Sequence, residues 1–215
     1  MEDCYFCHSK NAILEKLKTD QRAKGLIFDL DGTIADTMPI HFLAYRNILS
    51  KYGIDFTPEI FITMAGVPAI ETISRINGIF GTDLDPEKFG KLKEAEYEKN
   101  MSKMKPVKPV VDLIHEKYGK IPMAVGTGGY KRLAWKSLEI LGLKQYFTVL
   151  VSSEDVVNHK PQPDTFLKCA ELMGVKPRFC QVFEDGRLGI EAAHSAGMMA
   201  VDVTDYYEVS IGKEL

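Results

Sequence analysis

Six polar residues stand at or just beyond the ends of short apolar runs in this sequence. They are Asp29, Asp31, Thr127, Lys160, Glu184 and Asp185. Ligands of open α/β sheets bind outside the carboxyl ends of the strands, so polar residues at several such ends can form one site. Carboxylates can act as nucleophiles, acids or metal ligands, and an ammonium and a hydroxyl group can bind phosphate. The pattern therefore predicts one site with acidic and phosphate-binding side chains.

Each of these residues also has a purely structural interpretation. Asp and Gly in the run DLDGT at 29–33 favour turns for local reasons. Thr127 can cap a helix, and Lys160 can be a surface charge. The acidic pair at 184–185 can be a solvated strand end. A functional site is favoured because these residues occur together and in order, each at the predicted end of a different strand or loop.

Apolar runs that predict buried strands alternate with helical patterns along most of the chain. Strands are predicted at 24–29, 121–127, 147–152, 179–185 and 199–203, and helices at 130–141, 164–173 and 188–196. Alternation of this kind indicates a parallel sheet with helices on both faces. The predicted fold class is therefore a doubly wound α/β sheet.

The alternation stops between residues 37 and 105. Helical patterns such as 41–52 and 87–104 follow one another there without a convincing strand, which indicates a helical lobe inserted after the first strand. Pro106 and Pro109 mark its return to the core, because proline restricts the backbone. The expected organisation is an N-terminal tail at 1–23 with a short helix at 12–22, a catalytic core at 24–36 and 106–215, and a helical cap at 37–105.

The composition is that of an ordinary globular protein. The 215 residues are 45% hydrophobic and 27% charged, and the formal net charge is −3. This length suits one catalytic domain with an insert. Without a broad basic surface, neither nucleic acid nor an acidic membrane is an expected partner. No signal peptide or long apolar span is recognisable. We therefore expect a cytoplasmic monomer that acts on a small molecule.

The cysteines are few and scattered. Cys4, Cys7 and His8 form the C-x-x-C-H pattern of haem c attachment, but that chemistry requires export. A zinc site is a second possibility, although only three ligands are in view and structural zinc normally has four. A tail without a metal or haem is the favoured interpretation, and Cys169 and Cys180 are expected to be reduced thiols.

Four short motifs occur in order along the chain: Asp29-Leu30-Asp31-Gly32-Thr33, Thr127 after an apolar run, Lys160 in K-P-x-P, and Glu184-Asp185. Over roughly residues 24–205 they resemble the motifs of the haloacid dehalogenase superfamily. The resemblance implies an α/β core with an inserted cap and the hydrolysis of a phosphate monoester through an aspartyl-phosphate. It also implies Mg²⁺ as the cofactor.

The resemblance gives each motif residue an expected role. Asp29 is the nucleophile, and Asp31 protonates the departing oxygen and later deprotonates the attacking water. Lys160, Thr127 and the backbone near Gly128 bind the charged oxygens of the phosphoryl group. The implied Mg²⁺ ligands are the Asp29 carboxylate, the Asp31 carbonyl and the Asp185 carboxylate, with Glu184 binding directly or through water.

The insert resembles the cap of the β-phosphoglucomutase-like branch, which closes over the site and selects the substrate. Thr37 and His41 match positions of that branch, and His41 is expected to help position the general acid. A partly buried histidine that only packs is the alternative. Lys93 matches another cap position and is expected to contact distal hydroxyls of a sugar phosphate, with a solvent-facing lysine as the alternative.

A mutase of this branch holds the second phosphate of its intermediate with a cap arginine after a Gly-Val pair. Here Gly66-Val67 is followed by Pro68 and Ala69, and Arg75 lies further along the chain. The missing cation favours simple hydrolysis. Isomerisation of β-glucose 1-phosphate to glucose 6-phosphate is the alternative.

The residues around the motifs, AVGTG at 124–128 and HKPQPDTF at 159–166, are similar to those of bacterial fructose-1-phosphatase-like enzymes of the same branch. Gly129 departs from that pattern, because a serine often stands there. We therefore expect hydrolysis of a small sugar phosphate similar to fructose 1-phosphate. A non-catalytic metabolite-binding protein on the same fold is a third interpretation, and the intact acidic motifs and Lys160 argue against it.

Overall fold

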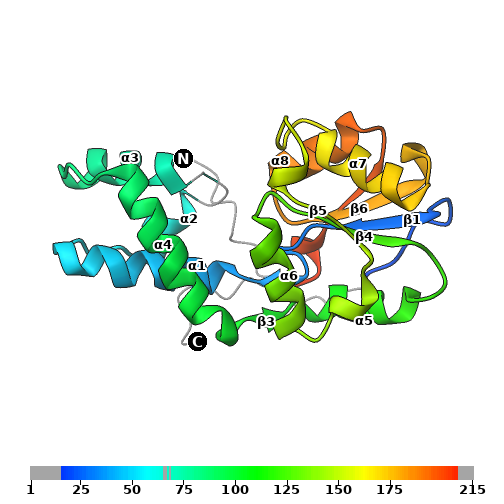
Figure 1. Ribbon diagram of the computed structural model, residues 1–215, viewed down its shortest axis with the longest axis horizontal. Helices are drawn as coiled ribbons and strands as arrows, with labels where there is room; N and C mark the ends of the chain where they lie inside the picture. Colours follow the sequence, from blue (N-terminus) through cyan, green and yellow to red (C-terminus); the bar gives the residue numbers. More distant parts are fainter. Residues whose placement is uncertain (1–15, 65–66, 68, 208–215) are drawn as a thin grey trace.

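A computed structural model describes residues 16–64, 67 and 69–207. Its core is a five-stranded parallel sheet in the order β5-β4-β1-β6-β7 (Figure 1). The strands are β1 (Gly25–Phe28), β4 (Met123–Gly126), β5 (Val149–Val151), β6 (Cys180–Glu184) and β7 (Met199–Asp202). The parallel sheet predicted from the sequence is confirmed.

The central strand β1 explains how the sheet is built. Phe28 pairs with Val125 of β4 and with Phe183 of β6, so the three strands end at the same edge. All four residues of β1 are buried, as expected for a strand covered on both faces. Leu26 and Phe28 pack into one core cluster and Ile27 into the other, because successive side chains point to opposite faces.

Two helices cover each face of the sheet. The helices α5 (Lys108–Lys117) and α6 (Lys131–Ile140) lie on one face, and α7 (Asp164–Met173) and α8 (Arg187–Ser195) lie on the other (Figure 1). Short 3₁₀ turns are Ser50–Tyr52, Met101–Lys103, Lys144–Tyr146, Ser153–Asp155, Pro177–Phe179 and Val203–Asp205. The helical patterns at 130–141, 164–173 and 188–196 correspond to α6, α7 and α8.

The insert is a helical lobe that lies beside the sheet domain (Figure 1). It consists of α1 (Met38–Leu49), α2 (Pro58–Ile62), α3 (Ala69–Phe80) and α4 (Pro86–Asn100). Buried aromatic and aliphatic side chains such as Phe42, Phe56, Ile73 and Phe89 form a core of its own. Other residues of α1 and α4, among them Ile40, Ala44 and Tyr97, belong to a cluster around the sheet, so the lobe also packs against the sheet domain.

Two connections differ from the sequence-based expectation. The chain enters and leaves the lobe through β2 (Ala35–Asp36) and β3 (Lys105–Pro106), which pair in antiparallel fashion. Strands of two residues are too short to produce a periodic pattern, so this pair was missed. The helix predicted at 41–52 begins earlier, at Met38, where Pro39 occupies the first turn.

The helix predicted at 12–22 is wrong for its described part, because residues 16–22 contain no helix. Asp20 instead accepts hydrogen bonds from the Arg22 backbone and guanidinium, which forms a local turn. The Asp20 backbone N–H donates to Gln181 Oε1 at 2.7 Å, and Leu17 is buried in the core. Leu17, which belongs to the apolar pattern, thus anchors the described part of this segment to the core.

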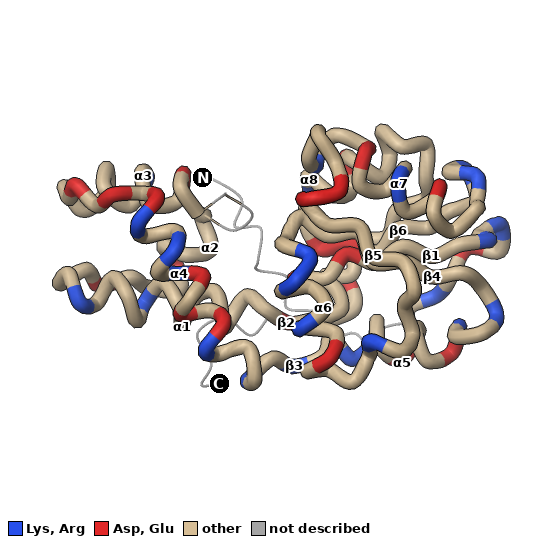
Figure 2. The backbone as a smooth tube through the Cα atoms, in the orientation of Figure 1, with Lys and Arg blue, Asp and Glu red and all other residues tan. Residues whose placement is uncertain are grey.

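Lys and Arg are interspersed with Asp and Glu over both lobes (Figure 2). Within the described residues, no helix is both long and apolar enough to cross a membrane. Cys169 and Cys180 are buried free thiols, and burial raises the pKa of Cys169 to about 12 and that of Cys180 to about 11. The segment with Cys4, Cys7 and His8 lies outside the described residues.

Candidate active site

A buried lysine joins two carboxylates at the carboxyl edge of the sheet. Asp29 follows β1 directly and is 6% exposed. Lys160, from the segment between β5 and α7, donates to Asp29 Oδ1 at 2.6 Å and to Glu184 Oε1 at 2.8 Å. Burial raises the pKa of Asp29, and the charge of Lys160 opposes this rise. Burial lowers the pKa of Lys160, but the two carboxylates outweigh it and raise the pKa, so Lys160 is charged.

Glu184 is held by the first turn of α8. Its Oε2 accepts a hydrogen bond from the Gly186 backbone N–H at 2.6 Å. A Cβ at Gly189 would lie 1.7 Å from Glu184 Oε1, so only glycine leaves room for this carboxylate. Both oxygens of Glu184 therefore have protein donors, and its clearest structural role is to orient Lys160. The expected Mg²⁺ contact of Glu184 stays a prediction.

Asp185 packs against the loop that carries Asp31. The Thr33 hydroxyl donates to Asp185 Oδ1 at 3.0 Å. Gly32 has a φ of +86°, and a Cβ there would lie 2.1 Å from Asp185 Oδ2. Gly32 is thus required both for its left-handed backbone and for the close approach of the carboxylate. Burial, together with the nearby charge of Glu184, raises the pKa of Asp185 to about 7.

The donor chemistry of this edge suits a hard divalent cation. The carboxylates of Asp29, Glu184 and Asp185 share a single buried ammonium group, so the cluster retains negative charge. Such charge is costly to bury unless a cation neutralises it. Among the described residues, no group of three or more His, Cys, Asp or Glu side chains is arranged to hold a metal. The implied set needs only two carboxylates and the Asp31 carbonyl, so the residues present fit Mg²⁺.

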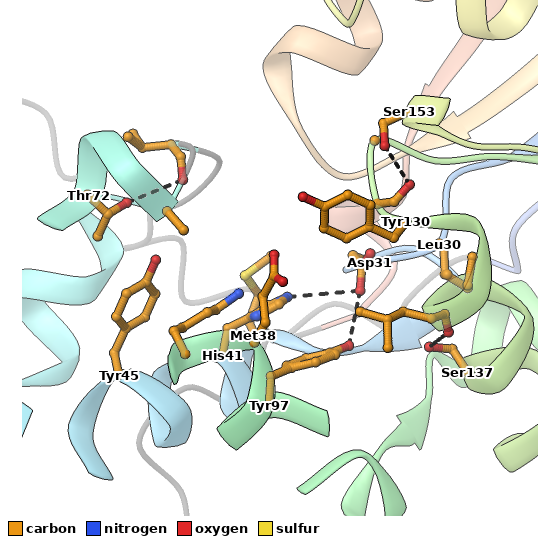
Figure 3. A pocket seen from close by; sticks show the side chains of 18 of the residues that line it. Leu30, Asp31, Met38, His41, Tyr45, Thr72, Tyr97, Tyr130, Ser137 and Ser153 are labelled. Carbon is orange, nitrogen blue, oxygen red and sulfur yellow. Dashed lines mark hydrogen bonds and ion pairs between the residues drawn. The ribbon is translucent and has the colours of Figure 1, made fainter. Parts of the chain in front are cut away.

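Asp31 is contacted by the helical lobe. Tyr97 of α4 donates its hydroxyl hydrogen bond to Asp31 Oδ1 at 3.4 Å, and His41 Nε2 of α1 lies 4.0 Å from the same oxygen (Figure 3). The His41 and Tyr97 rings stack, with centroids 4.3 Å apart. Burial raises the pKa of Asp31, which favours its protonated form and suits a general acid.

Thr37 and His41, which match positions of the cap, both lie near Asp31. Thr37 is fully buried, and its hydroxyl lies close enough to lower the pKa of Asp31, although its geometry falls short of a hydrogen bond. Burial lowers the pKa of His41 well below its usual value, and the positive charge of Lys93 lowers it further. His41 is therefore neutral at neutral pH and would meet Asp31 as a hydrogen-bonding partner rather than as a cation.

The loop after β4 brings the predicted phosphate-binding residues next to Asp31. Thr127 is 1% exposed, and its hydroxyl accepts a hydrogen bond from the Gly129 backbone N–H at 3.0 Å. A Cβ at Gly129 would lie 3.4 Å from Thr127 Oγ1 and 3.5 Å from Asp31 Oδ2, which is ordinary contact distance. The serine that often stands at this position would therefore fit, and Gly129 leaves the space open.

A cavity of about 740 Å³ lies between the lobe and the sheet domain. Asp31, His41, Lys93, Tyr97, Gly128 and Tyr130 are among its lining residues. Asp29 is buried and is not among the lining residues. Lys93 is partly buried in the wall, with Nζ 5.6 Å from the Tyr45 ring centroid and 5.3 Å from that of Tyr97. It therefore faces the cavity rather than bulk solvent.

The position of the mutase arginine holds no cation. Gly66 and Pro68 lie outside the described residues, whereas Ala69 lines the cavity. Arg75 forms an ion pair with Glu71 at 2.6 Å and does not line the cavity. Of the described lining residues, Lys93 alone is a lysine or arginine.

Ionic contacts join the lobe to the sheet domain beside the cavity. Arg132 of α6 binds Glu98 of α4 through two hydrogen bonds of 2.7 and 2.9 Å. Lys136 of α6 reaches the same carboxylate at 2.9 Å. These ion pairs link α4, the helix that carries Tyr97, to α6 of the sheet domain.

Comparison with known proteins agrees with this geometry. The family model of the haloacid dehalogenase-like hydrolases matches residues 26–203. Fructose-1-phosphate phosphatase YqaB of Escherichia coli is 44% identical over 184 residues, 85% of this chain and 97% of that protein. Beta-phosphoglucomutase of Bacillus subtilis is 32% identical over 188 residues, 84% of this chain and 83% of that protein. The crystal structure of beta-phosphoglucomutase from Clostridium difficile has a TM-score of 0.69 at 26% identity, with 84% of each chain covered.

The chain belongs to the haloacid dehalogenase-like hydrolase family. Within this family it is a phosphatase. The resemblance inferred from the four motifs is thereby confirmed. The roles of individual residues in the family reaction stay predictions. Tyr97 contacts Asp31 and is a candidate site residue that the sequence analysis did not identify. Its spacing of four residues from Lys93 on α4 was the available signal, because such residues share one helix face.

The raised pKa of Asp185 predicts how the metal-free phosphatase responds to pH. Between pH of about 4 and 7 the folded protein keeps a proton on Asp185 that the unfolded chain releases, so stability from this group falls as the pH rises. Asp185→Asn mimics the protonated form. With chelator at about pH 8, its melting temperature should exceed that of the wild type by roughly 3–6 °C. This gain should shrink as the pH falls toward about 5.

Circular dichroism melting curves across this pH range would measure the effect. Asp112→Asn is a matched control, because Asp112 is exposed and forms an ion pair with Lys108 at 2.6 Å. A lower melting temperature for Asp185→Asn at about pH 8 would show that Asp185 is not destabilising as an anion.

Proposed function

We propose that this phosphatase hydrolyses small sugar phosphates, of the kind exemplified by fructose 1-phosphate, with Mg²⁺ and through an aspartyl-phosphate on Asp29. The observation that carries the proposal is the placement of two distinct carboxylates. Asp29 is held against Lys160 at 2.6 Å, while Asp31 has a raised pKa and lines the cavity beneath the cap. The name of the Escherichia coli relative supports the substrate class.

In the first step an Asp29 carboxylate oxygen attacks phosphorus, and the bond between phosphorus and the sugar oxygen breaks. Asp31 gives its proton to the departing sugar oxygen. In the second step water attacks the same phosphorus, Asp31 takes a proton from that water, and the bond to Asp29 breaks. Burial raises the pKa of Asp31, which favours the protonated form that the first step needs.

The charged oxygens of the phosphoryl group need cations and hydrogen-bond donors. Lys160 is buried next to Asp29, and the Thr127 hydroxyl and the backbone at Gly128 lie on the neighbouring loop. Mg²⁺, held by the carboxylates of Asp29 and Asp185 and by the Asp31 carbonyl, would neutralise the remaining negative charge.

The cap residues would act when the substrate is enclosed. Tyr97 and His41 approach the same oxygen of Asp31 from two different helices of the lobe, so their positions depend on the lobe's orientation. We infer that they orient the Asp31 carboxyl for proton transfer, and that Lys93 contacts hydroxyls of the sugar. A closed cap also excludes water until the sugar has left.

The small number of cationic residues in the cavity argues against a mutase. An isomerising enzyme must retain a bisphosphate and turn it over within the site. Only one lysine or arginine, Lys93, lines the described part of the cavity, and Ala69 stands near the position of the second phosphate's arginine. Hydrolysis therefore fits better, although a relative that is 32% identical is a beta-phosphoglucomutase.

We expect a monomer located in the cytoplasm.

Phosphate release from a panel of sugar phosphates, with Mg²⁺ and with chelator, tests the proposal. The panel includes fructose 1-phosphate and β-glucose 1-phosphate, and glucose 6-phosphate is assayed in parallel. We expect Mg²⁺-dependent release of inorganic phosphate from one or more sugar phosphates. Formation of glucose 6-phosphate without free phosphate would instead show a mutase, and turnover unaffected by chelator would contradict the role of Mg²⁺.

A further inference from the structure

A tyrosine near the end of the described chain reaches the loop that carries Asp31. Tyr207 follows the turn Val203–Asp205 after β7, and its hydroxyl donates a hydrogen bond to the backbone carbonyl of Gly32. The ring is partly buried against the core cluster that contains Phe28 and Phe183. Burial, together with the charge of Asp185, raises the pKa of Tyr207, so its hydroxyl keeps the proton that it donates.

Gly32 is the point at which this contact enters the site. Its N–H donates to the Ala35 carbonyl at 2.7 Å, and its carbonyl accepts from Tyr207. The carboxylate of Asp185 lies against its Cα, since a Cβ there would be 2.1 Å from Oδ2. Gly32 is therefore enclosed by Tyr207, Ala35 and Asp185. A shift of Gly32 would move the neighbouring Asp31 carbonyl and would open space beside Asp185.

We propose that Tyr207 is a positioning residue, whose hydroxyl fixes the Gly32 carbonyl and thereby the distance between the Asp31 backbone and the Asp185 carboxylate. The inference rests on the proposed function, because that function requires both groups to hold Mg²⁺ and Asp31 to transfer protons. Glycine permits more backbone conformations than any other residue, so a loop centred on Gly32 needs an external restraint. Displacements of about 1 Å are enough to reduce catalysis strongly.

The test is Tyr207→Phe in the full chain, which removes the hydroxyl and keeps the ring. Tyr206→Phe is the matched control, because Tyr206 is the adjacent partly buried tyrosine and packs against the same core cluster. For each protein, kcat and KM are measured with the best sugar phosphate, Mg²⁺ binding is measured by titration calorimetry, and the folded fraction is measured by circular dichroism at the assay temperature.

Tyr207→Phe should lower kcat on the order of tenfold, leave KM within about twofold, and weaken Mg²⁺ binding several-fold. Tyr206→Phe should match the wild type in all three. A Tyr207→Phe protein with wild-type kcat and Mg²⁺ affinity would overturn the proposal. A loss of activity that is fully explained by the unfolded fraction would also overturn it. If the variant is less stable, kcat, KM and Mg²⁺ binding are compared at a lower temperature at which both proteins are folded. Because Mg²⁺ binding is measured without turnover, a wild type that releases no phosphate would refute the proposed function alone.

Discussion

Replacing Asp29 by asparagine is expected to reduce phosphate release by at least about three orders of magnitude while the protein stays folded. The amide has the shape of the carboxylate but is a poor nucleophile, so no covalent intermediate can form. Stability should not fall, because burial raises the pKa of Asp29 and its anionic form is therefore costly to bury. The measurement is Mg²⁺-dependent phosphate release, together with a urea denaturation curve.

The control for this variant is Asp112→Asn, which makes the same chemical change on the exposed face of α5. It should leave turnover and stability unchanged. If Asp29→Asn retained wild-type turnover, Asp29 would not be the nucleophile, and another group such as Asp31 or an activated water would have to attack phosphorus.

Removing the buried ammonium is expected to have the second large effect. Lys160→Met keeps most of the aliphatic stem but leaves Asp29 and Glu184 without their shared cation. Breaking a buried ion pair by removing one partner costs about 3–5 kcal/mol, so the free energy of unfolding should fall by that amount near pH 8. Turnover should fall on the order of 10³-fold, because in the proposed mechanism Lys160 also binds the transferring phosphoryl group.

The loss of stability in Lys160→Met should depend on pH. Burial already raises the pKa of Asp29, and removing Lys160 takes away the charge that opposes this rise. The Asp29 carboxylate therefore destabilises the folded state of the variant at high pH, and stability is recovered as Asp29 takes up a proton at lower pH. Urea denaturation at about pH 8 and about pH 5.5 measures the difference.

Lys168→Met on α7 is the matched control, because Lys168 is partly exposed and pairs at 3.0 Å with Glu171, which is well exposed. Exposed pairs contribute little, so this change should shift the unfolding free energy by less than about 1 kcal/mol. Equal stability of Lys160→Met and the wild type at about pH 8 would show that the two carboxylates are not held as buried anions.

The sequence by itself determined that the core is a parallel sheet and which acidic and polar residues lie at the carboxyl edge of that sheet. Continuous apolar runs such as 24–28 must be buried on both faces, and a polar residue that follows such a run must lie at the strand's carboxyl end. Parallel pairing then brings Asp29, Thr127 and Glu184 to one edge, as the register of β1 with β4 and β6 shows. These inferences need only the period of each element and the handed connection between them.

Only the tertiary structure decided how these residues are paired and what surrounds them. The contacts of Lys160 with Asp29, of Tyr97 with Asp31, and of Tyr207 with Gly32 span 131, 66 and 175 residues of sequence. Periodicity states which face of an element is buried but does not state which distant side chain meets it there. The physical reason is that these contacts depend on the packing of the lobe and of the chain's last described turn against the sheet, which no local pattern encodes.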